Sequence, residues 1–179
     1  TYEAGFTLGF STDTQDTTGT VTAQSEKRVT EDEVRAALNT FLGAHKQVPP
    51  MYSAIKIDGQ KLYDLARKGK EVERPARDIT ILDIELLNFD PDTQKGSFRV
   101  TCSKGTYVRT IVHDLGEKLG THAAMHALTR TRAGVYDLSE AVTFEQIERA
   151  RDDGTLEGLF RPTDSLFADD PAVRLTAEG

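Results

Sequence analysis

The chain has 179 residues, of which 37% are hydrophobic and 28% charged, a composition typical of a soluble globular protein with one substantial core. No run approaches the roughly 18 apolar residues of a membrane span, and no basic stretch followed by an apolar one indicates a signal peptide. The single cysteine cannot form an internal disulfide, which fits a reducing compartment. We therefore expect a cytoplasmic protein that does not bind membranes. We also expect it to be a monomer.

The formal net charge of −7 argues at first against a nucleic-acid partner, but its distribution weakens that objection. Residues 137–179 hold eleven acidic residues and four arginines, so residues 1–136 are neutral overall. Within them, residues 56–77 carry seven basic and four acidic side chains. Such a segment could meet a phosphate backbone, although a charge mixture of this kind is more often a solvated helix and loop.

The first third of the chain predicts two strands and a helix. Residues 1–10 alternate apolar and polar side chains, and residues 20–26 return as a second strand after a turn. The first strand begins at residue 1 with no turn or cap before it, which suggests a chain cut out of something longer. A helix is expected over residues 30–43, where a capping box precedes apolar residues at helical spacing.

The remaining elements complete the predicted fold. Residues 45–60 contain Pro49-Pro50 and are expected to be an extended loop, with a short helix after it over 61–69. The later elements are expected to be strands at 76–90 and 96–105, helices at 107–119 and 121–129, a strand at 134–138 and a helix at 143–151. This order, with strands in adjacent pairs, predicts an α+β fold with a mixed, largely antiparallel sheet flanked by helices.

Few residues suggest metal or nucleophilic chemistry. His122 and His126 stand four residues apart on an expected helix, but without an obvious third ligand they indicate packing histidines rather than a metal site. Cys102 alternates with Phe98 and Val100, a pattern typical of a buried strand thiol. Neither GxGxxG nor GxxxxGK[ST] occurs, so no phosphate-cradling glycine loop is expected.

The stretch QVPPMYSAIKIDGQKLYDLARKG, residues 47–69, is irregular yet dense in special side chains. Two prolines stiffen it, and two tyrosines are interleaved with Lys56, Lys61 and Arg67. This combination suits RNA, because aromatic rings stack on unpaired bases while cations meet phosphates. The alternative is an apolar loop folded over the core, and the segment alone does not decide between the two.

The stretch CSKGTYVRT, residues 102–110, places Arg109 in the first turn of an expected helix. Helix N-termini favour anions and penalise cations, so an arginine at this position is expected to have an anionic partner close by. The nature of that partner is the central question that the residues raise.

Three stretches resemble the TruB family of bacterial tRNA pseudouridine synthases: QVPPMYSAIKIDGQKLYDLARKGKEVERPAR, CSKGTYVRTIVHDLGEKLG and HALTRTRAGVY. The likeness runs from Tyr2 to about Asp164. It implies the pseudouridine synthase fold and the isomerisation of uridine 55 in the T-loop of tRNA, with no cofactor and no metal. It also implies that residues 1–170 are part of the catalytic domain and that residues 47–77 form a mobile thumb over the RNA stem-loop. Residues 171–179 would then be a linker towards an absent RNA-binding domain of the PUA type.

The resemblance also implies roles for single residues. Tyr2 would pack against the target base and Arg109 would pair with the catalytic aspartate, while Tyr107 and Leu128 would line the base pocket. The expected RNA contacts are Lys56, Lys61, Arg67, Lys104, Arg130 and Arg132. Two small departures are Thr129, where the family has arginine, and His113, where an acid is common.

One departure is large, because the family's nucleophilic aspartate lies in a GTLDPxATG-like motif that does not occur in this chain. Its position would precede Thr1. We therefore expect the carboxylate partner of Arg109 to lie outside the chain, and we expect neither Asp13, Asp16 nor Asp114, a predicted surface helix residue, to replace the nucleophile.

Two consequences follow from the missing motif. The chain alone would be inactive, and Arg109→Ala would cost little stability unless another acid stands beside the arginine. The alternatives are a non-catalytic module that binds tRNA or other RNA, and an unrelated α+β scaffold with a basic loop.

Overall fold

The computed structural model describes residues 1–57, 59–167 and 171, except for the side chain of residue 166. The chain divides into two compact units, Thr1–Arg130 and Thr131–Gly179. The catalytic region expected over residues 1–170 therefore extends across both units. Of the predicted linker, residues 172–179 lie outside the described residues.

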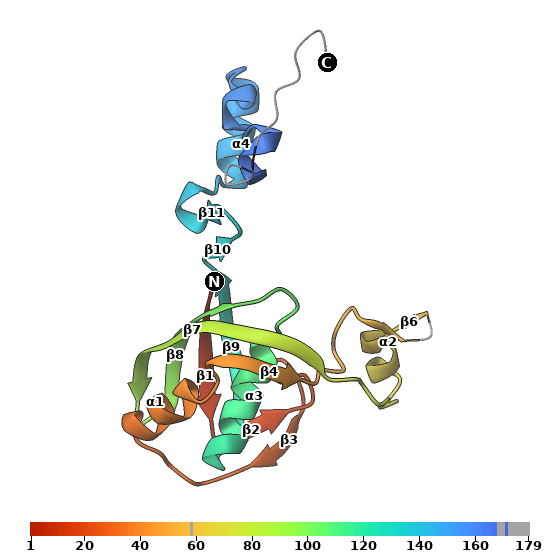
Figure 1. The fold of residues 1–179 in the computed structure, drawn as a ribbon, viewed down its shortest axis with the longest axis vertical. Coiled ribbons are helices and arrows are strands. Elements are labelled where there is room, and N and C mark those ends of the chain that lie inside the picture. The colour runs from red at the N-terminus through yellow and green to blue at the C-terminus, as the bar shows by residue number, and fades with distance from the viewer. Residues whose placement is uncertain (58, 168–170, 172–179) are drawn as a thin grey trace. The chain divides into compact units, whose positions relative to one another are not determined.

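The first unit is built on a five-stranded sheet (Figure 1). Its strands, in spatial order, are β4 (Gly43–Gln47), β7 (Arg77–Asp90), β8 (Lys95–Cys102), β1 (Tyr2–Leu8) and β9 (Ala123–Arg130). Each neighbouring pair is antiparallel. The α+β architecture predicted from the order of elements is confirmed, and strand β1 lies inside the sheet rather than at its edge.

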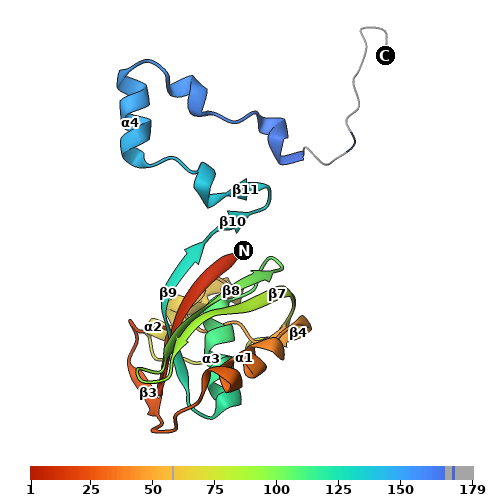
Figure 2. The ribbon, with the colours of Figure 1, turned by 90° about the vertical axis from the view of Figure 1, so that its left-hand side faces the viewer.

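Two helices, α1 (Glu31–Asn39) and α3 (Val108–Leu119), cover one face of this sheet (Figure 2). The helices bury apolar residues such as Val34 and Ile111 against the inward-facing residues of β1, Phe6 among them. Alternation in β1 and helical spacing in α1 and α3 place these side chains on the shared face. Thr30 and Glu33 form the predicted capping box at the start of α1. Burial of this common face holds the first unit together.

Smaller elements surround the sheet. Strands β2 (Phe10–Thr12) and β3 (Val21–Gln24) form a hairpin, and Gly9, with a φ of 103°, separates β2 from β1. Beyond the end of β4, residues 47–77 contain a small hairpin and a short helix (Figure 1). The hairpin pairs two strands of two residues each, β5 (Lys56–Ile57) and β6 (Gln60–Lys61), and the helix is α2 (Leu62–Arg67).

In the second unit, the residues that the structure describes form short elements only. A hairpin of β10 (Arg132–Ala133) and β11 (Tyr136–Asp137) precedes helix α4 (Phe144–Asp152), which confirms the helix expected over 143–151. Single 3₁₀ turns cover Leu138–Glu140, Leu156–Leu159 and Thr163–Phe167.

Two predictions of secondary structure were wrong. The helix expected over residues 121–129 is strand β9, because α3 ends at Gly120 with a left-handed φ of 66° and His122, with a φ of 55°, turns the chain back. Residues 43–47, much of which was expected to be loop, form edge strand β4, because their backbone groups pair with β7. His122 and His126 therefore do not share the helix face that metal binding would need.

Candidate active site and RNA-binding surface

Arg109 lies in the first turn of α3 and binds two other segments of the first unit. One terminal nitrogen, Nη1, donates to Asp16 Oδ2 at 2.8 Å and to the Thr14 carbonyl at 3.0 Å. The other, Nη2, donates to the Tyr52 carbonyl at 2.8 Å. The side chains of Arg109 and Asp16 are only 23% and 19% exposed. The expectation that the carboxylate partner of Arg109 lies outside the chain was wrong, since Asp16 is that partner here.

Asp16 is held as a fixed anion rather than left available for attack. Its Oδ1 accepts hydrogen bonds from the Thr14 hydroxyl and from the backbone amide and hydroxyl of Thr18, while Oδ2 accepts from Arg109. Burial raises the pKa of Asp16, but the hydrogen bonds from Thr18, Thr14 and Arg109 outweigh it, and the pKa lies below its ordinary value. A carboxylate with so many donors is a weak nucleophile.

Asp13 and Asp114 differ in their surroundings. Asp13 accepts from the Thr20 amide at 2.8 Å and from the Tyr52 hydroxyl at 3.4 Å. Asp114 was expected on the helix surface but is half-buried, and burial raises the pKa of its carboxyl. It lines a cavity with Phe41 and Gln47.

Tyr2, Leu128 and Arg130 lie on neighbouring strands and share one face of the sheet. In the antiparallel register Tyr2 is opposite Arg130, and Ala4 is opposite Leu128. Residues opposite each other, and residues two apart on one strand, point to the same face. The Arg130 guanidinium lies 5.4 Å from the centre of the Tyr2 ring, and 45% of Leu128 is exposed. The structure thus brings three of the predicted residues together near the start of β1.

Tyr107 comes from the loop before α3, and a residue that sequence reasoning missed holds it. The Gln47 side-chain oxygen accepts from the Tyr107 amide at 2.8 Å, and the Gln47 side-chain nitrogen donates to the Tyr107 carbonyl at 3.1 Å. Sixty positions separate the two residues, and no spacing rule links them. The one available signal was the place of Gln47 at the entrance to the unusual stretch 47–69.

The basic residues predicted in segment 47–77 gather around one cavity of about 470 Å³, which Lys56, Lys61 and Arg67 line together. Tyr63 stands beside two of these cations, with Lys61 Nζ 5.3 Å and Arg67 Cζ 5.4 Å from its ring centre. The segment also has its own apolar interior, because Leu62 is fully buried. The segment therefore combines an apolar interior with a cationic, aromatic exterior.

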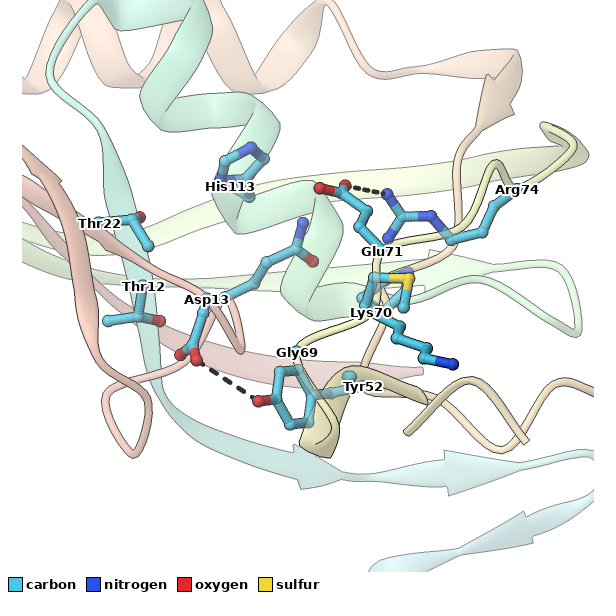
Figure 3. A pocket seen from close by; sticks show the side chains of 13 residues that line it. Thr12, Asp13, Thr22, Tyr52, Gly69, Lys70, Glu71, Arg74 and His113 are labelled. Carbon is cyan, nitrogen blue, oxygen red and sulfur yellow. Dashed lines mark hydrogen bonds and ion pairs between the residues drawn. The ribbon is translucent and has the colours of Figure 1, made fainter. Parts of the chain in front are cut away.

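A second cavity, of about 430 Å³, lies between the turn after β2, helix α3 and segment 47–77 (Figure 3). Tyr52 reaches Asp13 along one side, and Arg74 pairs with Glu71 at 3.1 Å on the other. His113, one of the departures from the family pattern, also lines it. The hydrogen bond from Tyr52 to Asp13 joins the start of segment 47–77 to the turn that also contains Asp16.

The remaining candidates lie elsewhere. Lys104 is exposed in the loop before α3, and Arg132 belongs to the second unit. Cys102 is half-buried on β8, and burial raises the pKa of its thiol, as a packed strand cysteine requires. In the described part of the chain no group of three His, Cys, Asp or Glu side chains could hold a metal ion. The described helices also include none that is long and apolar enough to cross a membrane.

Solved structures share this fold. The chain superposes on a chain of a Cbf5–Nop10–Gar1 complex with a TM-score of 0.67 at 24% identity, covering 92% of this chain and 42% of that one. An H/ACA RNP bound to a substrate RNA containing 2′-deoxyuridine gives 0.62 at 20% identity, covering 92% and 40%. At such low identity these likenesses show the fold alone.

The sequence comparisons are more specific. Residues 1–108 match the family model of the TruB family pseudouridylate synthase N-terminal domain, and residues 109–168 match that of the tRNA pseudouridylate synthase B C-terminal domain. The chain belongs to the TruB family of pseudouridylate synthases.

Two of the curated relatives come from bacilli. A protein of Bacillus velezensis named tRNA pseudouridine synthase B is 50% identical over 169 residues, which cover 92% of this chain and 55% of the relative. A Bacillus cereus protein of the same name is 46% identical over 179 residues, which cover 97% and 58%. The chain thus spans little more than half the length of these relatives.

Proposed function

We propose that this chain is part of a tRNA pseudouridine synthase that isomerises uridine 55 in the T-loop. The observation that carries the proposal is the fixed position of Arg109, an arginine that three hydrogen-bonded contacts hold at the start of α3. Its sequence context, KGTYVRT, is one of the stretches that resemble the family. The names of the curated relatives support the substrate.

The reaction sets clear demands on the site. The bond from uracil N1 to the ribose must break, the base must turn, and C5 must bond to the ribose and lose its proton while N1 gains one. A carboxylate can attack the sugar or the base, and an adjacent arginine keeps that carboxylate ionised. Tyr2 would stack on the extruded base, with Tyr107 and Leu128 around it, as enzymes that act on flipped bases require.

In this proposal the nucleophile is not among residues 1–179. Asp16 uses both oxygens to bind donors, and a GTLDPxATG-like motif does not occur. Arg109 would then interact with two carboxylates. Asp16 would fix its orientation, and its positive charge would keep the nucleophile ionised. The chain alone would bind T-arm RNA without converting it.

RNA binding would use segment 47–77. Its shared cavity of basic side chains and the cation-flanked Tyr63 offer both phosphate and base contacts. Lys104, Arg130 and Arg132 would add contacts to the backbone. Asp16 and Arg109 tie this segment to the site through Tyr52, so that RNA held by the segment would lie next to the arginine.

The test is tritium release from T-arm RNA that carries 5-tritiated uridine, with binding of the same RNA measured in parallel. We expect binding but no release from the 179-residue chain. Release at an enzymatic rate would show that an aspartate within the chain does the chemistry. Failure to bind T-arm RNA would contradict the RNA-binding part of the proposal.

A variant in which basic side chains of segment 47–77 are replaced by uncharged ones tests whether this segment binds the RNA. Replacing Lys56, Lys61 and Arg67 together by glutamine removes three positive charges, and the salt-dependence slope of binding should fall by about 1 for each of them that meets a phosphate. A matched control replaces Arg35, Lys46 and Lys118, three bases around α1, β4 and α3. Equal effects of the two variants would contradict a binding role for segment 47–77.

A further inference from the structure

The side chain of Gln47 forms a bridge between the sheet edge and the start of α3. Gln47 is the last residue of β4, where its backbone pairs with Arg77 of β7. Its side chain leaves the strand and binds both backbone groups of Tyr107, as acceptor and as donor. Only 5% of Gln47 is exposed, so water cannot readily replace these two bonds.

The loop that ends at Tyr107 is attached at both of its ends. At the first, Ser103 and Thr80 exchange two hydrogen bonds of 2.9 Å, one of them through the Ser103 hydroxyl. At the second, the amide of Gln47 holds Tyr107. Between them Gly105 adopts a φ of 84°, a conformation that glycine reaches without strain. The two strands β7 and β4 thus place the loop before α3.

The two hydrogen bonds with Gln47 also satisfy backbone groups at the start of α3. Tyr107 is the N-cap residue of α3, yet its side chain makes no capping hydrogen bond. Its carbonyl accepts from the Thr110 and Ile111 amides and, in addition, from Gln47. A primary amide offers one donor and one acceptor side by side, the pair that a residue's backbone groups require. Methionine offers neither, and an ionised glutamate offers no donor.

We infer that Gln47 is a positioning residue of the base pocket: by holding both backbone groups of Tyr107, it sets where that ring meets the target base. The inference rests on the proposed function, which places Tyr107 in the pocket. Gln47 touches no substrate in this account and acts through Tyr107. It also joins the base pocket to segment 47–77, because that segment begins at Gln47.

The experiment compares the affinity of the 179-residue chain for two T-arm hairpins, one with uridine and one with an abasic nucleotide at the target position. Phosphate contacts are common to both hairpins, so the ratio of the two affinities reports the contribution of the base pocket alone. We expect the wild type to prefer uridine by roughly tenfold, the range of one stacked base, and Gln47→Met to remove most of that preference. Gln24→Met, at the exposed end of β3, is the matched control and should keep it.

A second variant covers the case in which Gln47→Met does not fold. In Gln47→Glu the new carboxyl, when protonated, can donate to the Tyr107 carbonyl and accept from its amide, and burial favours this neutral form. We expect the preference for uridine to be present at pH 5.5 and lost at pH 8. The charged or titratable groups around the neighbouring cavity are His45, Lys46, Asp114, Glu117 and Lys118, so the wild type is measured at both pH values.

The outcomes are distinct. A wild type without preference for uridine overturns the proposed base pocket, and the inference with it. A wild type that prefers uridine, with a folded Gln47→Met variant that prefers it equally, overturns the inference alone. A folded Gln47→Glu variant without preference for uridine at pH 5.5, where the neutral carboxyl can make both hydrogen bonds, does the same.

Discussion

Arg109 joins residues that are far apart in the sequence, and this explains a cation at a helix N-terminus. The macrodipole of α3 disfavours a positive charge in its first turn by a fraction of 1 kcal/mol. The ion pair with Asp16 and the hydrogen bonds that Arg109 donates to two backbone carbonyls offset that cost. Because both charged side chains are largely shielded from water, the pair is stronger than those on the surface.

Removal of this arginine should therefore be costly. Arg109→Ala leaves Asp16 without its counter-charge and two carbonyls without a donor, and we expect a loss of about 2–3 kcal/mol in the free energy of unfolding. The control is Arg99→Ala, whose side chain is 42% exposed in its pairs with Glu3 and Glu85 and should cost less than about 1 kcal/mol. Urea unfolding measures both, and equal losses would show that the pair at Asp16 is no stronger than a surface pair.

The same carboxylate predicts a pH dependence. The pKa of Asp16 lies below its ordinary value of 3.8 in the folded chain, so its ionised form favours folding. That contribution is complete above the unfolded pKa and is lost as the pH falls through the folded pKa. We expect Asp16→Asn to destabilise the chain at pH 7 and to differ progressively less from the wild type below about pH 4. A constant difference from pH 7 to pH 3 would contradict the lowered pKa.

At the scale of elements, the close approach of α3 and β9 depends on a small residue. The chain turns back directly after α3, and a Cβ built on Gly116 would lie 2.3 Å from the backbone of His122 and Ala123. Backbone atoms cannot move aside as a flexible side chain can. Glycine inside a helix, ordinarily unfavourable, is required here by the tight turn into the strand.

We expect Gly116→Ala to lower the free energy of unfolding by at least about 2 kcal/mol, although alanine is the better helix former. The control is Gly158→Ala in the 3₁₀ turn Leu156–Leu159, where nothing lies within 4 Å of the added atom. That variant should change stability by less than about 0.5 kcal/mol. Thermal or urea unfolding distinguishes them, and a neutral Gly116→Ala would show that the turn can widen.

At the scale of the whole molecule, the two units differ in how much apolar surface they bury. In the described part of the chain, the buried hydrophobic residues run from Ala4 to Met125, all within the first unit. Helix α4 of the second unit buries none of its residues, and its Phe144 is 83% exposed. The hydrophobic stabilisation from these buried residues therefore belongs to residues 1–130.

It follows that residues 1–130 should fold without the second unit. We expect a protein of these residues to unfold in one cooperative transition, with a midpoint within a few degrees of the full chain, as followed by circular dichroism during heating. A broad transition, or none, would show that residues 131–179 are needed for the fold of the first unit.

The sequence predicted local elements better than their long-range partners. The capping box of α1 and the alternation of β1 are local signals, and both predictions are confirmed. Residues 121–129 have too weak a period to distinguish helix from strand, and only pairing with β1 decides for β9. The partner of Arg109 was missed for the same reason, because a turn 93 positions away supplies Asp16.

The place of β1 inside the sheet has a consequence for how the chain folds. Tyr2 is paired with Val100 on one side and Arg130 on the other, so almost the whole first unit must form a closed loop before both neighbours are present. Closing such long loops costs entropy before any pairing compensates for it. The hairpin of β7 and β8, whose strands are adjacent in sequence, can form early, whereas insertion of β1 would complete the sheet late and set a slow folding rate.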